Sequence, residues 1–244
     1  MSDLNKLTGF VRRCVQDYDM IQQGDTVAVG VSGGKDSLTL LCALTELSRY
    51  YPKEFSVHAI TVDMGYEGMD FSGVQRLCDE LKVPYTVRKT YIKQIIFDSR
   101  HEKNPCALCA KMRRGAIHDV MGELGIKKIA LGHHFDDAVE TFLLSLLYEG
   151  RISCFEPVTY LDRTGVTQIR PMLYVGEGTV RNFARDNALP VVFNPCPMDG
   201  NSKRQEVKEL IGTLSADYPR LKTKIFTAMQ NLPLSGWEKP GTNR

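Results

Sequence analysis

The stretch SGGKDS, residues 32–37, lies between an apolar, β-branched run at 26–31 and an amphipathic stretch that begins at residue 38. This order predicts a strand, a tight loop and a helix. Two adjacent glycines allow backbone N–H groups to approach an anion closely, and the helix that follows adds the positive end of its dipole. The stretch therefore predicts a cradle for the phosphates of a nucleotide, which points to ATP chemistry.

The common Walker A loop is excluded at this position. That loop requires G-x-x-x-x-G-K-[ST], whereas here Asp36 follows Lys35, and Val29 stands five positions before Gly34. A glycine-rich turn without a ligand is the alternative interpretation. The Ser, Lys and Asp side chains around the glycine pair exceed what turn formation needs, so we favour the phosphate cradle.

Length and composition indicate one main domain with small additions. The chain has 244 residues, of which 43% are hydrophobic, so it can bury a full core. We expect an N-terminal helix at 1–24, a nucleotide-binding catalytic domain at 25–200, and C-terminal helices with a tail at 201–244. The net charge of +2 neither demands nor excludes nucleic acid. Because the start is polar and no apolar run approaches a membrane span, we expect a soluble, cytoplasmic protein without a membrane partner.

Runs of strand type and helix type alternate along the chain. Strands and helices in this order need right-handed crossovers and hence a parallel sheet, which is an α/β fold. Such sheets bind ligands at the carboxyl ends of their strands. The expected strands are 26–31, 55–62, 85–88, 128–131 and 190–193. The expected helices are 7–21, 37–50, 73–81, 111–124, 138–148 and 177–187, with two more in 201–231 and a long loop at 150–164.

Carboxylates follow two of the expected strands. Asp63 ends the second strand and could contact ribose, adenine or a metal, or it could simply be a solvated strand end or a helix cap. The string GHHFDD, residues 132–137, follows the fourth strand. Asp136 and Asp137 could hold Mg²⁺ against the phosphates, because Mg²⁺ prefers few protein oxygens together with substrate oxygens. The alternative is a capping box between Asp137 and Glu140 at the start of a helix.

The cysteines form a third cluster. Seven cysteines without a secretory signal favour free thiols or metal ligands over disulfides. Cys106 and Cys109 have the C-x-x-C spacing that lets two thiolates bind one metal centre, and Cys196 could supply a third. A [4Fe-4S] cluster held by three cysteines has one iron free to bind sulfide, as a sulfur-inserting enzyme needs.

Other interpretations of these cysteines stay open. They are a structural zinc site with His101 or Asp199 as a fourth ligand, a redox C-x-x-C pair, and no special role. Cys154 lies in the expected loop and is a further candidate. The cysteines within helix-like apolar patterns are expected in the core: Cys14, Cys42 and Cys78.

SGGKDS resembles the PP-loop of the ATP-pyrophosphatase superfamily. Together with CALCAKMRRG at 106–115, GHHFDD at 132–137 and PCPMDGNSKR at 195–204, it resembles the tRNA 2-thiocytidine synthetase family over nearly the whole chain. The resemblance implies an adenine nucleotide alpha hydrolase-like fold and cleavage of ATP between its α and β phosphates. One departure stands out, since family members often carry a second C-x-x-C in the late segment, whereas Cys196 has no partner three residues away.

The resemblance also implies roles for individual residues. Ser32, Gly34, Asp36 and Ser37 would hold the pyrophosphate, and Lys35 would neutralise its charge. The implied nucleotide-binding set is Ala28, Ser32, Gly33, Gly34, Lys35, Asp36, Ser37, Asp63, Met64 and Gly132. The implied catalytic set is Lys35, Asp36, Asp136 and Asp137. The implied ligands of the iron–sulfur cluster are Cys106, Cys109 and Cys196.

The reaction that the resemblance implies has two steps. O2 of a cytidine in tRNA attacks the α-phosphorus of ATP bound with Mg²⁺ and releases pyrophosphate, and sulfide then attacks C2 and expels AMP. A sulfide or persulfide donor, such as a cysteine desulfurase, would supply the sulfur. Two alternatives stay open: the same chemistry on a small sulfur-containing molecule, and a nucleotide- or metal-binding sensor without catalysis.

Two groups of basic residues could bind RNA phosphates, although solvated helix surfaces explain them equally well. The first group follows the C-x-x-C pair: Lys111, Arg113 and Arg114. The second group lies near the C-terminus: Lys203, Arg204, Lys208, Arg220, Lys222 and Lys224. Because no appended RNA-binding module is recognisable, either the catalytic domain binds tRNA directly, with a homodimer as one arrangement, or the acceptor is not tRNA.

Overall fold

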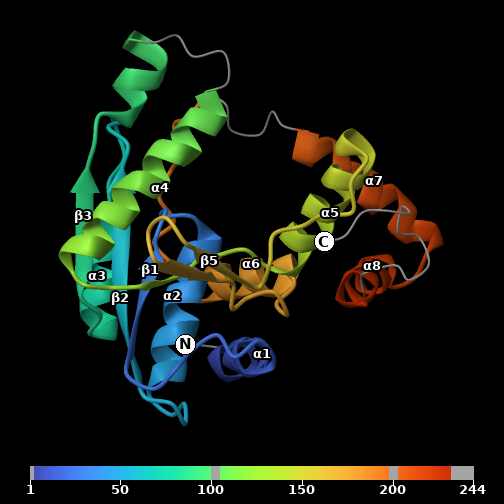
Figure 1. The fold of residues 1–244 in the computed structure, drawn as a ribbon, viewed down its shortest axis with the longest axis horizontal. Helices are drawn as coiled ribbons and strands as arrows, with labels where there is room; N and C mark the ends of the chain where they lie inside the picture. Colours follow the sequence, from blue (N-terminus) through green and yellow to red (C-terminus); the bar gives the residue numbers. More distant parts are fainter. Residues whose placement is uncertain (1–2, 100–104, 198–202, 232–244) are drawn as a thin grey trace. The chain divides into compact units, whose positions relative to one another are not determined.

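The computed structural model describes residues 3–99, 105–197 and 203–231. By its internal contacts the chain divides into two compact units, and Figure 1 shows the elements of both. The first unit comprises Met1–Phe135 and Phe155–Gly200, and the second comprises Asp136–Cys154 and Asn201–Arg244. The second unit thus joins a segment from the middle of the chain to the C-terminal helices, a grouping that is not visible in the linear sequence.

The first unit contains a six-stranded sheet in the order β3-β2-β1-β4-β6-β5. The strands are β1 Asp25–Gly30, β2 Phe55–Asp63, β3 Tyr85–Lys89, β4 Lys128–Ala130, β5 Val158–Leu161 and β6 Val166–Ile169. Strands β3, β2, β1, β4 and β6 are parallel, and β5 pairs with β6 antiparallel. The order runs outward from β1 in both directions, so the sheet reverses its winding between β1 and β4. In such sheets the ligand site lies at the carboxyl ends of the strands beside this reversal.

Helices of the first unit cover the sheet on both faces. They are α1 Leu4–Asp17, α2 Lys35–Ser48, α3 Ser72–Leu81, α4 Pro105–Glu123 and α6 Glu177–Asp186, with a π-helix, η1, at Gln94–Ser99. Helix α2 packs between α1 and α6 and is buried along most of its length, because its sequence is apolar on nearly every side. Figure 1 shows α4 crossing one face of the sheet with α2 behind the sheet.

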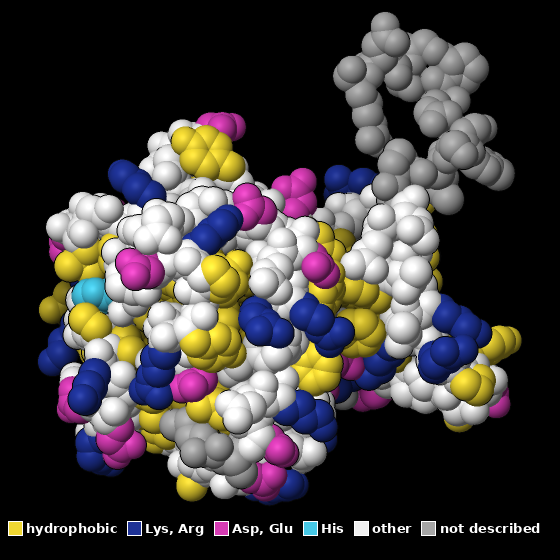
Figure 2. All heavy atoms as spheres, turned by 90° about the horizontal axis from the view of Figure 1, so that it is seen from below, with side chains coloured by type: hydrophobic (Ala, Val, Ile, Leu, Met, Phe, Trp, Pro, Cys, Tyr) yellow, Lys and Arg dark blue, Asp and Glu magenta, His cyan; other side chains and the backbone are white. Residues whose placement is uncertain are grey.

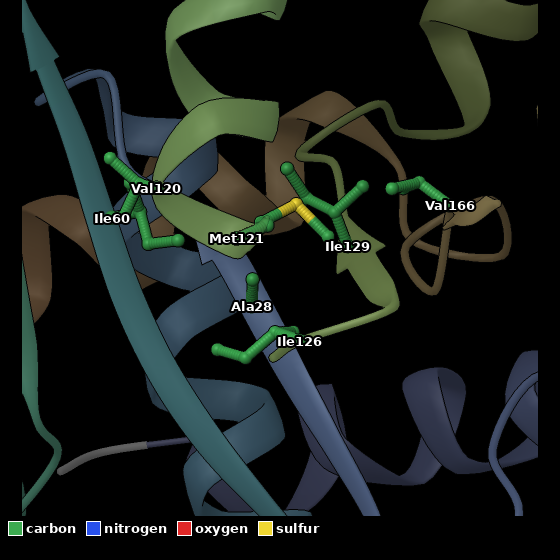
Figure 3. Close-up of a cluster of buried hydrophobic side chains, with 7 residues drawn as sticks. All are labelled: Ala28, Ile60, Val120, Met121, Ile126, Ile129 and Val166. Atoms are coloured by element: carbon green, nitrogen blue, oxygen red, sulfur yellow. The ribbon is translucent and has the colours of Figure 1, made fainter. Parts of the chain in front are cut away.

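A cluster of buried side chains joins α4 to the sheet (Figure 3). Val120 and Met121 of α4 pack on Ala28 of β1, Ile60 of β2 and Ile129 of β4, and all five are at most 2% exposed. Burying an apolar side chain of this size contributes about 1.5–3 kcal/mol. The cluster therefore holds the C-terminal part of α4 against the central strands.

The second unit is helical. It contains α5, Phe135–Glu149, whose first residue belongs to the first unit, and the helices α7, Lys203–Asp217, and α8, Leu221–Gln230. Helices α7 and α8 contact one another, and Val207, Ile211 and Phe226 are buried. The expected pair of C-terminal helices is therefore present, whereas the tail at 232–244 lies outside the described residues. None of the described helices is both long enough and apolar enough to cross a bilayer.

The structure corrects two predictions about the sheet. Residues 190–193 do not form a strand, because the segment pairs with no neighbouring strand, although the N–H of Val192 donates to the carbonyl of Gly33 at 2.9 Å. The expected loop at 150–164 contains β5, which turns at Gly165 into β6. The sheet is therefore mixed, with one antiparallel edge strand, although most of it is parallel as expected.

Two helices begin earlier than the sequence indicates. Helix α4 begins at Pro105, since proline is well tolerated in a first turn, and so Cys106 and Cys109 lie on the helix itself. Helix α5 begins at Phe135, which places Asp136 and Asp137 inside its first turn. The alternative of a capping box with Asp137 at the N-cap is therefore wrong. Both carboxylates instead lie where the helix dipole favours negative charge.

Candidate active site

The glycine turn connects β1 to α2 at the carboxyl edge of the sheet. Gly33 has a φ of +85°, and a Cβ placed on it would lie 2.8 Å from Cβ of Val192. Both observations require glycine, since the left-handed region disfavours other residues and the neighbouring segment leaves no room. The hydroxyl oxygens of Ser32 and Ser37 lie 3.2 Å apart, and the Ser37 hydroxyl donates to the Gly34 carbonyl at 2.9 Å. These bonds fix the turn before any ligand arrives.

Helix α2 presents its N-terminus at this turn. Gly34 is the N-cap residue, and a glycine supplies no side-chain oxygen to the first-turn N–H groups. Those N–H groups and the helix dipole favour an anion. Lys35 Nζ lies 2.9 Å from Asp36 Oδ1 and 3.8 Å from Glu177 Oε1 at the start of α6. The Lys35 ammonium is thus held beside the turn by two carboxylates.

The end of β4 approaches the same turn. A Cβ placed on Gly132 would lie 3.2 Å from the carbonyl carbon of Asp36 and 3.2 Å from the backbone nitrogen of Ser37. His134 Nε2 lies 3.8 Å from Asp36 Oδ1. The structure therefore brings the first half of GHHFDD to the glycine turn. This agrees with the expectation that residues following parallel strands meet at one edge of the sheet. Gly132 is needed there for close backbone approach.

The end of β2 lies next to the end of β1. Asp63 Oδ1 accepts a hydrogen bond from the N–H of Gly65 at 2.9 Å, which closes a turn directly after the strand. Met64 follows and faces the cysteines described below. Ala28 on β1 is fully buried in the cluster of Figure 3, so its side chain packs in the core. Contact of these residues with adenine stays a prediction.

Three cysteines line one pocket of about 200 Å³, together with Met64, Tyr66 and Arg113. Cys106 and Cys109 are three positions apart on α4 and so share a face of the helix. Cys109 Sγ lies 3.7 Å from Met64 Sδ, and the hydroxyl of Tyr66 donates to Cys196 Sγ at 3.5 Å.

Asn194 completes the cysteine pocket and holds Cys196 in place. Its Oδ1 accepts a hydrogen bond from the N–H of Cys196 at 3.2 Å. Both residues lie outside the regular helices and strands. This side chain-to-backbone bond substitutes for a strand pairing in the segment. The structure thus brings Cys196 into the same pocket as the 106/109 pair, from a segment that lies far along the chain.

The electrostatics of the pocket favour binding of a cation to the thiols. Burial raises the pKa of the Cys109 thiol, the neighbouring Cys196 and Cys106 raise it further, and the Arg113 guanidinium opposes the rise. Burial and the hydrogen bond to Cys196 likewise raise the pKa of Tyr66. A positively charged metal centre beside Cys109 would instead favour its thiolate form.

The donor set fits a sulfur-rich metal centre. Thiolates are soft ligands that select iron–sulfur clusters, copper(I) or zinc, and no described residue of the pocket lining is a carboxylate or an imidazole. Among the described residues, however, no three His, Cys, Asp or Glu side chains already converge as a group that could hold a metal ion. The thiols share a pocket, and ligation would require them to turn toward one point. His101 and Asp199, the fourth ligands of the zinc alternative, lie outside the described residues.

The acidic residues of α5 make ion pairs within the second unit. Lys222 Nζ lies 2.6 Å from Asp136 Oδ1, and Asp136 is 6% exposed. Arg204 Nη1 lies 3.4 Å from both Asp137 Oδ1 and Glu140 Oε2. Burial raises the pKa of Glu140, while Arg204 lowers it. The local negative charge is large enough to attract two basic side chains, which is a property that a Mg²⁺ site also needs.

The basic residues predicted to bind RNA lie in different environments. Arg204 and Lys222 neutralise carboxylates of α5, and Lys203 pairs with Glu206 at 2.8 Å. Arg113 lines the cysteine pocket, whereas Lys111 and Arg114 are exposed. On the face drawn in Figure 2, lysine and arginine side chains are interspersed with acidic and apolar ones. On that face, charge alone therefore does not outline an RNA-binding surface.

Several residues of the site were not identified from the sequence. Tyr66 and Asn194 hold Cys196, and Glu177 holds Lys35. Tyr66 lies directly after the turn that ends β2, which was a usable signal because side chains at strand ends meet at one edge. Asn194 and Glu177 come from distant segments, and no local pattern marks them.

Comparison with known proteins identifies the family. The family described as "PP-loop domain" matches residues 6–213. This chain belongs to the PP-loop family. Within it, the chain is 37% identical over 225 residues to the tRNA-cytidine(32) 2-sulfurtransferase of Citrifermentans bemidjiense, covering 91% of this chain and 88% of that protein. It is 38% identical to the protein of the same name from Syntrophotalea carbinolica, covering 94% and 88%.

Solved structures agree with the assignment of this chain to the PP-loop family. The U34-tRNA thiolase NcsA from Methanococcus maripaludis, determined with its [4Fe-4S] cluster, matches with a TM-score of 0.73 at 26% identity, over 94% of this chain and 79% of that one. The NH3-dependent NAD synthetase from Campylobacter jejuni matches with a TM-score of 0.50 at 15% identity, over 95% and 93%, and shows the shared fold only. The expected fold class and the recognition of the tRNA 2-thiocytidine synthetase family are confirmed, and the protein is an enzyme of the ATP pyrophosphatase type.

Proposed function

We propose that this PP-loop enzyme uses ATP to replace the O2 oxygen of a tRNA cytidine with sulfur. The observation that carries the proposal is the pocket lined by Cys106, Cys109 and Cys196, whose lining residue Asn194 is two positions from Val192, which bonds to Gly33 of the glycine turn. Met64 contacts Cys109 and follows the carboxyl end of β2, which pairs with the strand that leads into the glycine turn. An activated base and a sulfur source would therefore meet at one edge of the sheet. The names of the relatives support tRNA as the substrate.

In the first step the residues of the glycine turn bind and orient ATP. The N–H groups at 33–37 and the hydroxyls of Ser32 and Ser37 would hold the β and γ phosphates. O2 of the cytidine attacks the α-phosphorus, the new O–P bond forms, and the bond from the α-phosphorus to the β-bridging oxygen breaks. Lys35 would move from Asp36 and Glu177 to the departing pyrophosphate, whose charge it stabilises. Asp136 and Asp137 are the proposed ligands of Mg²⁺, in place of the cations that they now contact.

In the second step sulfide attacks C2 of the adenylated base, a C–S bond forms, and AMP leaves with the former O2 oxygen. Cys106, Cys109 and Cys196 would hold a [4Fe-4S] cluster, which when bound supplies an iron without a protein ligand where sulfide can be kept. Tyr66 and Asn194 would keep Cys196 oriented toward this position. We expect sulfide, or a persulfide delivered by a cysteine desulfurase, as the sulfur source, and tRNA binding directly to the catalytic unit or to a homodimer.

Anaerobic reconstitution tests this proposal. We expect a brown, iron-containing protein that forms thiolated cytidine and releases pyrophosphate only when tRNA, ATP and sulfide are present. C106A, C109A and C196A should each lose sulfur transfer but still bind ATP, and C154A is the matched control that should retain both. A colourless protein with one zinc would overturn the proposal. Pyrophosphate release with a small sulfur-containing acceptor in place of tRNA, or ATP binding without any release, would do the same.

A further inference from the structure

The segment 192–196 connects the two halves of the site. At its start the N–H of Val192 donates to the Gly33 carbonyl at 2.9 Å, and the Val192 side chain occupies the space where a Cβ of Gly33 would lie. At its end the N–H of Cys196 donates to Asn194 Oδ1 at 3.2 Å, and Cys196 Sγ accepts a hydrogen bond from the Tyr66 hydroxyl at 3.5 Å. The backbone is thus anchored on both sides of residue 193.

Phe193 points away from this anchored backbone. Side chains alternate along the segment, so Val192 faces the glycine turn whereas Val191 and Phe193 face outward. Phe193 is 75% exposed and Val191 is 54% exposed. The exposed Phe193 ring can therefore bind a ligand at low entropic cost. The backbone that carries it is already anchored, so the segment loses little conformational freedom on binding.

We propose that Phe193 stacks on the unpaired tRNA base that receives the sulfur. The proposal rests on the function proposed above. Proteins that act on or read single RNA bases take the base out of its stack and place it against an aromatic side chain. Phe193 lies between Val192, which contacts the phosphate cradle, and Asn194, which lines the cysteine pocket. A base that must first meet ATP and then sulfide has to lie between these two places.

The adenine of ATP is the other planar group that could stack on the Phe193 ring. Phe193 is directly followed by Asn194 of the cysteine pocket, and the base that receives sulfur has to reach that pocket, whereas adenine takes no part in the sulfur transfer. Stacking of a base on an aromatic side chain contributes about 1–3 kcal/mol, which corresponds to roughly 5- to 150-fold in affinity.

The test uses the full-length reconstituted enzyme and an RNA hairpin with the target cytidine unpaired in its loop. F193A should weaken binding of the hairpin by about 5- to 150-fold, whereas F193W should bind nearly as well as the native protein. V191A is the matched control, because it shortens the other exposed side chain of the same segment and should bind normally. A hairpin with 2-aminopurine at the target position should lose fluorescence on the native protein and keep it on F193A, since only a stacked base is quenched. Thermal unfolding and ATP affinity of F193A should match the native protein.

The outcomes separate this inference from the proposed function. If the native enzyme thiolates tRNA but F193A binds the hairpin and quenches 2-aminopurine like the native protein, the stacking role is wrong and the function stands. If F193A instead weakens ATP binding and leaves the hairpin unaffected, the ring belongs to adenine and the inference is overturned. If the native enzyme neither binds nor thiolates tRNA, the proposed function itself fails and the stacking role fails with it.

Discussion

At the scale of single residues, the phosphate cradle depends on the backbone more than on side chains. Gly33 adopts a left-handed conformation and touches Val192, and Gly132 allows β4 to approach the start of α2. The side chains of Ser32 and Ser37 bond to one another and to the turn. A ligand therefore meets a turn whose hydroxyls and helix N-terminus are already in place, with the Lys35 ammonium close by.

Replacing Gly33 with alanine tests this dependence. The φ of +85° and the 2.8 Å approach to Val192 predict a loss of at least about 1–2 kcal/mol of unfolding free energy, together with weaker ATP binding. G115A is the control, because Gly115 lies within α4 and a Cβ there meets nothing within 4 Å. That change should be neutral or stabilising by about 0.5–1 kcal/mol, since alanine favours a helix. Chemical denaturation and ATP titration measure both effects, and equal behaviour of the two variants would contradict the account.

At the scale of elements, helix α4 and helix α5 each place functional groups in a first turn. Packing of Val120 and Met121 on the sheet fixes the far end of α4, and the cysteines lie at its start. Helix α5 carries three carboxylates in its first two turns, and α7 and α8 supply the cations that neutralise them. These helices therefore form the second unit through charge as much as through apolar burial.

Removing Arg204 tests the contribution of these ion pairs. R204A takes the guanidinium away from Glu140, whose side chain is 7% exposed, and from Asp137. Because Arg204 itself is 39% exposed and partly screened, we expect a loss of about 1–3 kcal/mol in unfolding free energy. K203A changes the neighbouring residue, whose pair with Glu206 is exposed, and should leave stability nearly unchanged. Urea unfolding compares the two, and a similar effect of both variants would show that the pairs of α5 do not matter.

At the scale of the whole molecule, the seven cysteines fall into two chemical classes. Burial raises the pKa values of Cys14, Cys42 and Cys78 to about 12, from an ordinary value of 9.0. Cys106 is exposed, and Cys109, Cys154 and Cys196 are partly exposed. The sequence expectation that the first three are core residues is confirmed.

Timed alkylation of the metal-free protein tests this division. At pH 8 the exposed Cys106 should be modified first, while Cys14, Cys42 and Cys78 stay protonated, buried and unmodified. Stability should fall as the pH rises from about 9 toward 12, because the thiol of the unfolded chain loses its proton there and the buried thiol does not. Mass spectrometry of the alkylated peptides and thermal unfolding between pH 8 and 10.5 give the two readings. Modification of Cys42 as fast as Cys106 would contradict the assignment.

Features that depend on neighbouring residues could be predicted from the sequence. The glycine turn, the strand before it, the helix after it and the C-x-x-C pair are all local patterns, because backbone conformation and helix dipoles act over a few residues. Periodicity also predicted the parallel strands β1 to β4. It did not predict β5 or β6, each four residues long, nor the irregular course of 190–193, since a strand requires a partner that local sequence does not name.

Contacts between distant residues became visible once the chain was seen folded. Val192 lies against Gly33, Cys196 joins Cys106 and Cys109, Glu177 holds Lys35, and Arg204 reaches carboxylates 67 and 64 positions away. Each of these contacts follows from the closing of long loops by the packing of the core, and their energies depend on burial and geometry that no short stretch of sequence encodes. The sequence defines the chemistry of each group, and the fold determines which other groups it contacts.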